Sequence, residues 1–183
     1  MTLDDVVPNP HHRMCHSRAV GAPPGVVWDE LHAVTMSALP VGRALEAARL
    51  LPARLIGRRH QQLGGRSFLD VAPIPVIVSE RPDAVISAGL SQAWRVFGGS
   101  TPPHLDAADL RAWSQPGWVK IGMEFRLEPT PLGTLLRTET RILATDPKTR
   151  RAFAAYWFVI HPASAAIRRE LLRTVAHRSE LRV

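Results

Sequence analysis

The chain has 183 residues, one cysteine and a formal net charge of +7. This length fits one domain that buries a sizeable core, and a single cysteine excludes an internal disulfide framework. No apolar run approaches the ~18 residues of a membrane span, and the acidic start over 1–5 is unlike a signal peptide. We therefore expect a cytoplasmic protein without integral membrane association, formed by one domain over 1–183 with a flexible N-terminus at 1–11.

The positive charge is concentrated in two segments. Residues 43–66 carry six Arg and one Glu, and residues 148–182 carry eight basic and two acidic groups. Such segments suit phosphates, an anionic membrane or an acidic partner, but they equally suit solvated helix faces. Because no aromatic-basic recognition motif accompanies them, we expect no specific nucleic-acid partner and only weak, salt-sensitive association with polyanions.

The first third of the chain predicts a strand followed by two helices. Weak alternation from His12 to Val20 favours a strand, which ends in the turn Gly-Ala-Pro-Pro-Gly at 21–25. Apolar residues at helical spacing over 27–34 then indicate a short amphipathic helix. A second helix is expected from Val41 to Ile56, interrupted by Pro52.

In the middle of the chain the hydrophobic period changes to two. Residues 74–80 and 84–90 are rich in strand-forming side chains and are joined by a plausible hairpin turn, and residues 92–97 continue as a third run. Residues 106–113 then favour one or two helical turns inside a long connection. We expect these runs to belong to an antiparallel meander.

The clearest strand pair lies between Trp118 and Ala144, with a turn at 128–133. Apolar side chains share one face of the first strand and charged side chains share the other. The predicted register pairs Leu127 with Thr134, Phe125 with Leu136, Met123 with Thr138, Ile121 with Thr140, Val119 with Ile142 and, on the charged face, Glu124 with Arg137. Met123 and Phe125 are therefore expected inside, and Glu124 and Arg137 outside.

The last quarter of the chain predicts a long helix. Asp146 suits an N-cap and Pro147 suits the first helical position. An apolar stripe follows at spacings of three and four: Phe153, Trp157, Ile160, Ser164, Ile167, Leu171 and Val175. Pro162 interrupts the backbone hydrogen bonding, so we expect a kinked helix or two abutting helices. Arg168 lies off this stripe, so its replacement is expected to leave hydrophobic-probe binding unchanged.

The order of strand, two helices, antiparallel meander and long terminal helix resembles the helix-grip fold of the START-like or SRPBCC superfamily, which includes polyketide cyclase-like proteins. The segments that carry the resemblance are His16–Trp28, Thr138–Arg141, Asp146-Pro147 and Tyr156–Pro162, the latter three similar to uncharacterised actinobacterial members. The resemblance spans 12–180 and implies an α+β fold in which a curved antiparallel sheet wraps around the terminal helix. The stretch from Met36 to Ser67 departs from it, being longer and more helical than in minimal members.

Motifs that would indicate a specific chemistry are weak. His11, His12, Cys15 and His16 have metal-capable side chains, but on a strand Cys15 points away from His12 and His16, so no tetrahedral site closes locally. Cys15 favours a buried inert thiol, because no flanking sequence positions a base beside it. Glu139 would be an acid-base candidate inside a cavity, but the predicted register places it outside. We therefore expect no bound metal and no cofactor, and the sequence identifies no catalytic residue.

The resemblance implies binding or carriage of a hydrophobic small molecule, lipid-like or polyketide-like, in a cavity between sheet and terminal helix. The alternatives are a cyclase, aromatase or hydrolase that uses the same cavity, and a basic protein that touches RNA or a membrane surface. Trp157, Ile160 and Ile167 are expected to close one side of the cavity, with a hinge at Pro162. The expected cavity lining is Val119, Ile121, Met123, Phe125, Leu136, Thr138, Thr140, Tyr156, Trp157, Ile160 and Ile167.

Overall fold

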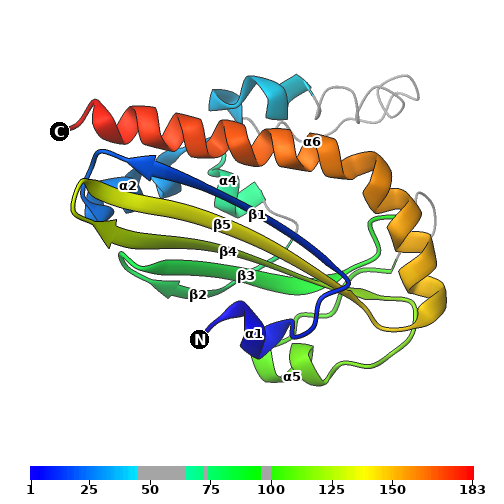
Figure 1. The fold of residues 1–183 in the computed structure, drawn as a ribbon. Coiled ribbons are helices and arrows are strands. Elements are labelled where there is room, and N and C mark those ends of the chain that lie inside the picture. The colour runs from blue at the N-terminus through cyan, green and yellow to red at the C-terminus, as the bar shows by residue number, and fades with distance from the viewer. Residues whose placement is uncertain (45–64, 72–73, 96–99) are drawn as a thin grey trace.

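The computed structural model describes residues 1–44, 65–71, 74–95 and 100–183. Its elements follow the order expected for a helix-grip protein (Figure 1). They are α1 (Leu3–Val6), β1 (His12–Val20), α2 (Pro24–Ala33), the 3-10 turn η1 (Met36–Ala38), α4 (Phe68–Val71), β2 (Val76–Glu80), β3 (Ala84–Ser91), α5 (Ala107–Ala112), β4 (Val119–Thr130), β5 (Gly133–Ala144) and α6 (Pro147–Glu180).

The five strands form one antiparallel sheet in the order β1-β5-β4-β3-β2. Helices α2 and α6 cover one face, and α6 runs along the whole sheet (Figure 1). The expected α+β helix-grip fold is thereby confirmed. The strand expected at 92–97 is wrong over its described part, because 92–95 lie in a turn, and 96–97 lie outside the described residues. Most of the helix expected over 41–56 also lies outside them, although 40–44 are helical.

The register of the β4–β5 hairpin differs from the predicted one by two residues. Leu127 pairs with Leu136 and Phe125 with Thr138, and the strands continue to a two-residue turn between Thr130 and Gly133. Gly133 has φ +134°, and a Cβ there would lie 2.2 Å from the carbonyl oxygen of Val20, so only glycine fits.

The prolines of this hairpin explain the error. Pro129 suggests a turn because it cannot donate to a sheet ladder. Leu127 donates its N–H toward the β3 side, to the carbonyl of Asp83, and the nitrogen of Pro129 points to the same side two residues later. Arg126 is the last β4 residue that pairs with β3, opposite Ala84, so no ladder hydrogen bond is lost at Pro129. The error of two preserves both faces, and Phe125 and Met123 lie inside while Glu124 and Arg137 lie outside, as expected.

The inner face of the sheet carries the main core. Toward the C-terminal half of α6, residues such as Leu171 and Val175 pack with α2, with α4 and with inner-face side chains that include Phe125 and Leu136. Toward its N-terminal half, Phe153 packs with Val119, Ile142 and Ala144 in a separate cluster. Two apolar clusters therefore lie under α6.

The outer face carries a third cluster, which includes the chain's N-terminus. Helices α1 and α5 lie on the side of the sheet opposite α6 (Figure 1), and Val6 and Val7 pack there with Leu110 and Trp118. Gly122 permits this approach, because a Cβ at that position would lie 2.7 Å from Leu3 Cδ2. Leu3, Val6 and Val7 are buried against the sheet, and the flexibility of residues 1–11 stays a prediction. The sequence did not predict this docking, because the short acidic segment contains few apolar residues and no periodic pattern.

Helix α6 is continuous and bent. The Asp146 side chain accepts hydrogen bonds from the N–H and hydroxyl of Thr149, at 2.9 and 2.6 Å, so it caps the helix as predicted. Pro162 lies inside α6. The first turns of α6 lie at an angle to the longer, C-terminal part of the helix (Figure 1). Proline lacks the N–H that the carbonyl of Phe158 would accept, which accounts for a kink there. No described helix is long and apolar enough to cross a bilayer.

Buried Glu30 of α2 fixes the other end of α6. Its carboxylate oxygens lie 2.6 Å from Arg178 Nε and 2.9 Å from Arg182 Nε, and Glu30 is 1% exposed. The Arg178 contact is an ion pair without hydrogen-bond geometry. Two of the basic residues that suggested a polyanion-binding face therefore neutralise a carboxylate of this chain.

Candidate functional site

Three rows of side chains cross the inner face beneath the middle of α6. The strand register places His16, Thr138, Phe125 and Val85 in the first row, Met14, Thr140, Met123 and Ser87 in the second, and His12, Ile142, Ile121 and Gly89 in the third. Each row takes one residue from β1, β5, β4 and β3. The rows therefore bring together residues that are more than a hundred positions apart in sequence.

Some residues that lie between the sheet and α6 in this middle part are not fully buried. Ile121 lies in β4, flanked by strands on both sides, and packs against both apolar clusters under α6, yet it is only half-buried. On the helix, Ile160, Ser164 and Ile167 belong to the apolar stripe and are also half-buried. Among the core-facing residues of β4 from Val119 to Leu127, Ile121 is the one that is not buried.

Three polar atoms of the first two rows have no hydrogen-bond partner in the described protein. In the described part of the chain, His16 Nε2, Thr138 Oγ1 and Thr140 Oγ1 are buried without a hydrogen bond. Thr138 is 3% exposed and Thr140 is 7% exposed. Folded proteins pair the large majority of such atoms, because an unsatisfied buried hydroxyl costs about 1–3 kcal/mol. Three of them in neighbouring rows mark this area as the candidate site.

Arg168 reaches the same area from α6. Its guanidinium carbon lies 5.1 Å from the ring centre of Phe68 and 5.7 Å from that of Phe125, a first-row residue. Its Nε and Nη1 atoms are buried and have no hydrogen-bond partner among the described residues. Burial lowers the pKa of Arg168 to about 10, so the side chain stays charged at neutral pH.

The position of Arg168 corrects the expectation that it lies off the sheet-facing stripe. A sequence signal existed: Arg168 is four residues after Ser164 and four before Leu172, and residues at that spacing lie on one side of a helix. The stripe was drawn through apolar residues only, so a charged residue at its edge was assigned to solvent. The long side chain then carries the charge inward.

Histidines line the β1 edge of the site. Burial, assisted by the positive charges of Arg169, Arg168 and His161, lowers the pKa of His16. Burial, with Arg150 and His161, likewise lowers the pKa of His12. Both imidazoles are therefore neutral at neutral pH, and each can accept as well as donate a hydrogen bond.

An aromatic group closes the end of the site under the first turns of α6. Phe153 stacks on Trp157 at 6.0 Å between ring centres, and Tyr156 and Trp94 contact Phe153 at 5.6 and 5.7 Å. The ring of His12 lies 5.9 Å from that of Trp157. Trp157, Tyr156 and Trp94 are half-buried, so this end combines large apolar surfaces with partial access.

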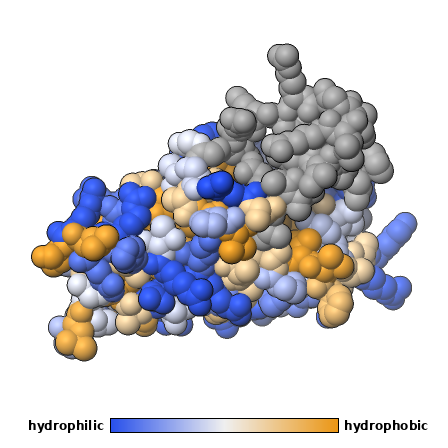
Figure 2. Space-filling view, turned by 90° about the horizontal axis from the view of Figure 1, so that it is seen from above, coloured by the Kyte–Doolittle hydropathy of each residue, from blue (hydrophilic) through white to orange (hydrophobic). Residues whose placement is uncertain are grey.

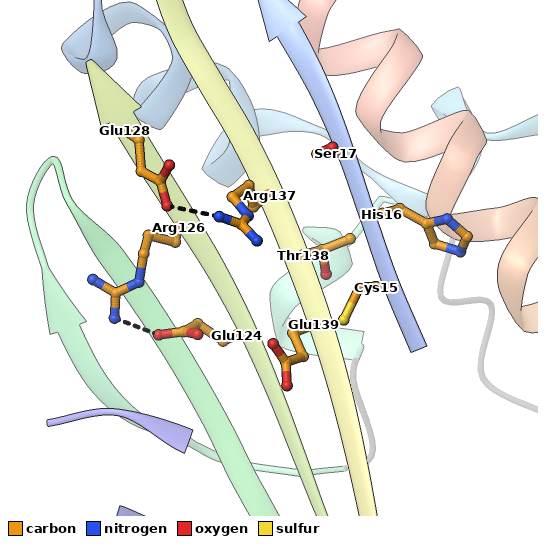
Figure 3. Close-up of a pocket in the computed structure, with 9 residues that line it drawn as sticks. All are labelled: Cys15, His16, Ser17, Glu124, Arg126, Glu128, Arg137, Thr138 and Glu139. Atoms are coloured by element: carbon orange, nitrogen blue, oxygen red, sulfur yellow. Dashed lines mark hydrogen bonds and ion pairs between the residues drawn. The ribbon is translucent and has the colours of Figure 1, made fainter. Parts of the chain in front are cut away.

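A groove of about 460 Å³ lies on the other side of the sheet and differs in character (Figure 3). Its charged side chains are paired: Arg126 with Glu124 at 2.6 Å, and Arg137 with Glu128 at 3.3 Å. Cys15, Ser17 and Glu139 also line the groove, together with His16 and Thr138, which the strand register assigns to the inner face. A polar, internally neutralised groove offers little to a hydrophobic ligand.

Glu139 and Cys15 both lie on this outer face. Glu139 accepts two hydrogen bonds from Arg13, at 2.7 and 2.9 Å, and one from Arg141, which also pairs with Asp4. Burial alone would raise the pKa of Glu139, but these hydrogen bonds outweigh it and lower the pKa. Cys15 is exposed, which corrects the expectation of a buried thiol. The described residues contain no group of three or more metal-capable side chains.

The predicted lining residues are all buried or half-buried. Val119, Met123, Phe125, Leu136, Thr138 and Thr140 are buried; Ile121, Tyr156, Trp157, Ile160 and Ile167 are half-buried. Their contact with a ligand stays a prediction. Sequence reasoning missed Arg168, and it considered His16 only as a metal ligand.

The side of the molecule that carries α6 shows no single large apolar face. Hydrophilic and hydrophobic residues are interspersed over the part that is visible from above (Figure 2). Phe158 and Val159 on the outer side of α6 are 83% and 73% exposed.

No family model matches the sequence, and no curated protein matches it. Similar solved structures include protein MLL2253 from Mesorhizobium loti, at 18% identity and a TM-score of 0.40, covering 91% of this chain and 98% of that chain. The Zhui aromatase/cyclase from Streptomyces sp. R1128 has 17% identity, a TM-score of 0.32 and coverage of 93% and 94%. CalU16 from Micromonospora echinospora has 16% identity, a TM-score of 0.28 and coverage of 92% and 83%. At these scores the likenesses carry no weight for ligand or reaction, and the helix-grip assignment rests on the strand order and terminal helix of this chain.

Proposed function

We propose that this protein binds a hydrophobic small molecule between the inner face of the sheet and α6. The observation that supports the proposal is the partial exposure of Ile121, which stays half-buried in a strand flanked on both sides although it faces the core. Apolar clusters flank this space at both ends. Ligand sites of this kind are mostly apolar and contain a few converging polar groups, which here are Thr138, Thr140 and His16.

A neutral fluorescent dye such as Nile red tests the proposal directly. Wild-type protein is expected to bind the dye with enhanced emission, and Ile121→Trp, which fills the proposed space, is expected to weaken binding at least about tenfold. Leu135→Trp is the matched control, because Leu135 is a half-buried residue on the outer face of neighbouring β5. No binding by wild type, or equal binding by Ile121→Trp, would contradict the proposal.

Trp157 and its neighbour in sequence give a second test. Trp157→Ala removes half-buried aromatic surface from the end of the site and is expected to change dye binding more than far-ultraviolet circular dichroism. Phe158→Ala removes a ring that is 83% exposed and is expected to change neither. Equal effects of the two replacements would show that dye binding does not involve the inner side of α6.

Native mass spectrometry of protein purified from its own host distinguishes carriage from catalysis. A carrier is expected to hold an apolar molecule whose mass stays constant during incubation. A cyclase, aromatase or hydrolase would convert the co-purified molecule or release a product. We favour carriage, because the described inner face offers neutral His16 as a proton acceptor but no nucleophile paired with it.

A further inference from the structure

Arg168 is half-buried as a residue, but its guanidinium nitrogens Nε and Nη1 are buried, and it differs from the buried charged residues of the described chain in lacking a partner for them. Glu30 is neutralised by two arginines, Arg141 by Asp4 and Glu139, and the ammonium of Lys120 donates to the carbonyl of Arg111 at 2.6 Å. No described carboxylate lies within ion-pair distance of Arg168, and two of its buried nitrogens have no acceptor. Its charge is therefore uncompensated in the described structure.

The contacts of Arg168 reduce the free-energy cost of burying its charge, but they do not remove that cost. The rings of Phe68 and Phe125 offer cation-π attraction at 5.1 and 5.7 Å, which is weaker than an ion pair with hydrogen bonds. A buried charge without a partner destabilises a fold. An interior arginine with free donors is therefore suited to a partner that is not part of the protein.

The surrounding groups specify the chemistry of that partner. The guanidinium of Arg168 lies near the ring of Phe125, which is in the first row with His16 and Thr138, and Thr140 lies in the second row. The guanidinium and the two hydroxyls can all donate, and neutral His16 can donate from one ring nitrogen. An ionised carboxylate only accepts hydrogen bonds and matches the arginine fork with two parallel bonds.

We propose that the ligand is an amphiphilic carboxylate whose head group binds Arg168, with Thr138, Thr140 and His16 as further hydrogen-bond donors. The inference rests on the proposed function, since it names the class of molecule that occupies the same site. Its apolar body lies toward Trp157, which is 11 positions before Arg168, or about 16 Å along a straight helix. The aromatic end of the site supplies the apolar surface, and Arg168 supplies the charge.

The test compares ligands that share one chain and differ in the head group. Dodecanoate, dodecyl phosphate and dodecanol are titrated by displacement of Nile red. Wild type is expected to prefer dodecanoate over dodecanol by about 10- to 100-fold, the range of a charged hydrogen-bonded contact. Tighter binding of dodecyl phosphate than of dodecanoate would overturn the carboxylate assignment.

Replacement of Arg168 separates recognition from stability. Arg168→Met keeps the length of the side chain and is expected to abolish the preference for dodecanoate while dodecanol binding persists. Because an uncompensated buried charge is removed, the thermal midpoint of the ligand-free protein is expected to rise by about 2–4 °C. Arg168→Lys keeps the charge but not the fork, so it is expected to restore only part of the preference.

The outcomes keep the two proposals apart. If neither ligand displaces the dye because the dye itself does not bind, the proposed function fails. If dodecanol and dodecanoate bind wild type equally, or if Arg168→Met retains the preference, the hydrophobic site stands and the carboxylate inference is overturned. Glu46 is the one acidic residue of the sequence 45–64, outside the described residues. Unchanged dodecanoate affinity in Glu46→Gln supports the inference, and a gain would show that Arg168 already has a protein partner.

Discussion

On the outer face of the sheet, Arg13, Glu139, Arg141 and Asp4 form one continuous network of ion pairs, whereas on the inner face Arg168, His16, Thr138 and Thr140 share no hydrogen bond. The two faces are made by alternate residues of the same strands. Glu139 points to one side and its neighbours Thr138 and Thr140 point to the other.

This difference separates two uses of polar side chains. On the outer face Arg13, Asp4, Glu139 and Arg141 are paired with one another, so this network contributes to folding and needs no ligand. On the inner face the donors are buried and lack acceptors, so they reduce the stability of the ligand-free protein and remain available to a bound molecule. Replacements on the two faces are therefore expected to differ in sign as well as in size.

Phe125→Ala is expected to have the largest effect. Phe125 is fully buried and packs in the main cluster, so its loss should reduce the free energy of unfolding by about 3–5 kcal/mol, measured in urea. Leu132→Ala, at a turn residue that is 90% exposed, should stay within about 0.5 kcal/mol. A loss well below the lower bound would show that Phe125 lines open space rather than packed core.

Glu139→Gln tests the outer network and gives it a pH dependence. The replacement should cost about 1 kcal/mol at neutral pH, since the ion pairs are partly exposed and screened by salt. The pKa of folded Glu139 lies below its ordinary 4.5, so the stabilisation is fully present above that pH and is lost as pH falls through the folded pKa. The stability gap between wild type and variant should accordingly close in acid. A gap that stays constant down to pH ~3 would contradict the assignment of the network to ionised Glu139.

Thr140→Val is expected to have the smallest effect and the opposite sign. It removes a buried hydroxyl without a partner and conserves shape, so the ligand-free protein should gain between zero and about 1 kcal/mol. Thr134→Val is the matched control on the same strand, because the Thr134 hydroxyl donates to the carbonyl of Ala22 at 2.7 Å. That variant should lose about 1 kcal/mol. If both replacements destabilise equally, Thr140 has an acceptor and the contrast between the faces fails.

Local signals in the sequence determined most elements and which side chains share a face. The strand over His12–Val20 and the helix that starts after Asp146 follow from alternation, apolar spacing and capping, which act over a few residues. Even the wrong register of the β4–β5 hairpin left Phe125 inside, because an error of two residues preserves the pleat.

Only the tertiary structure determined which side chains from distant segments contact one another. The docking of Leu3 over Gly122 and the exposure of Cys15 depend on contacts between distant segments. The same holds for Arg168, whose long side chain can extend to solvent or fold inward from the edge of a helical stripe. Periodicity fixes the direction of a Cα–Cβ bond, but the position of a charge at the end of a flexible side chain depends on the groups that surround it in the folded protein.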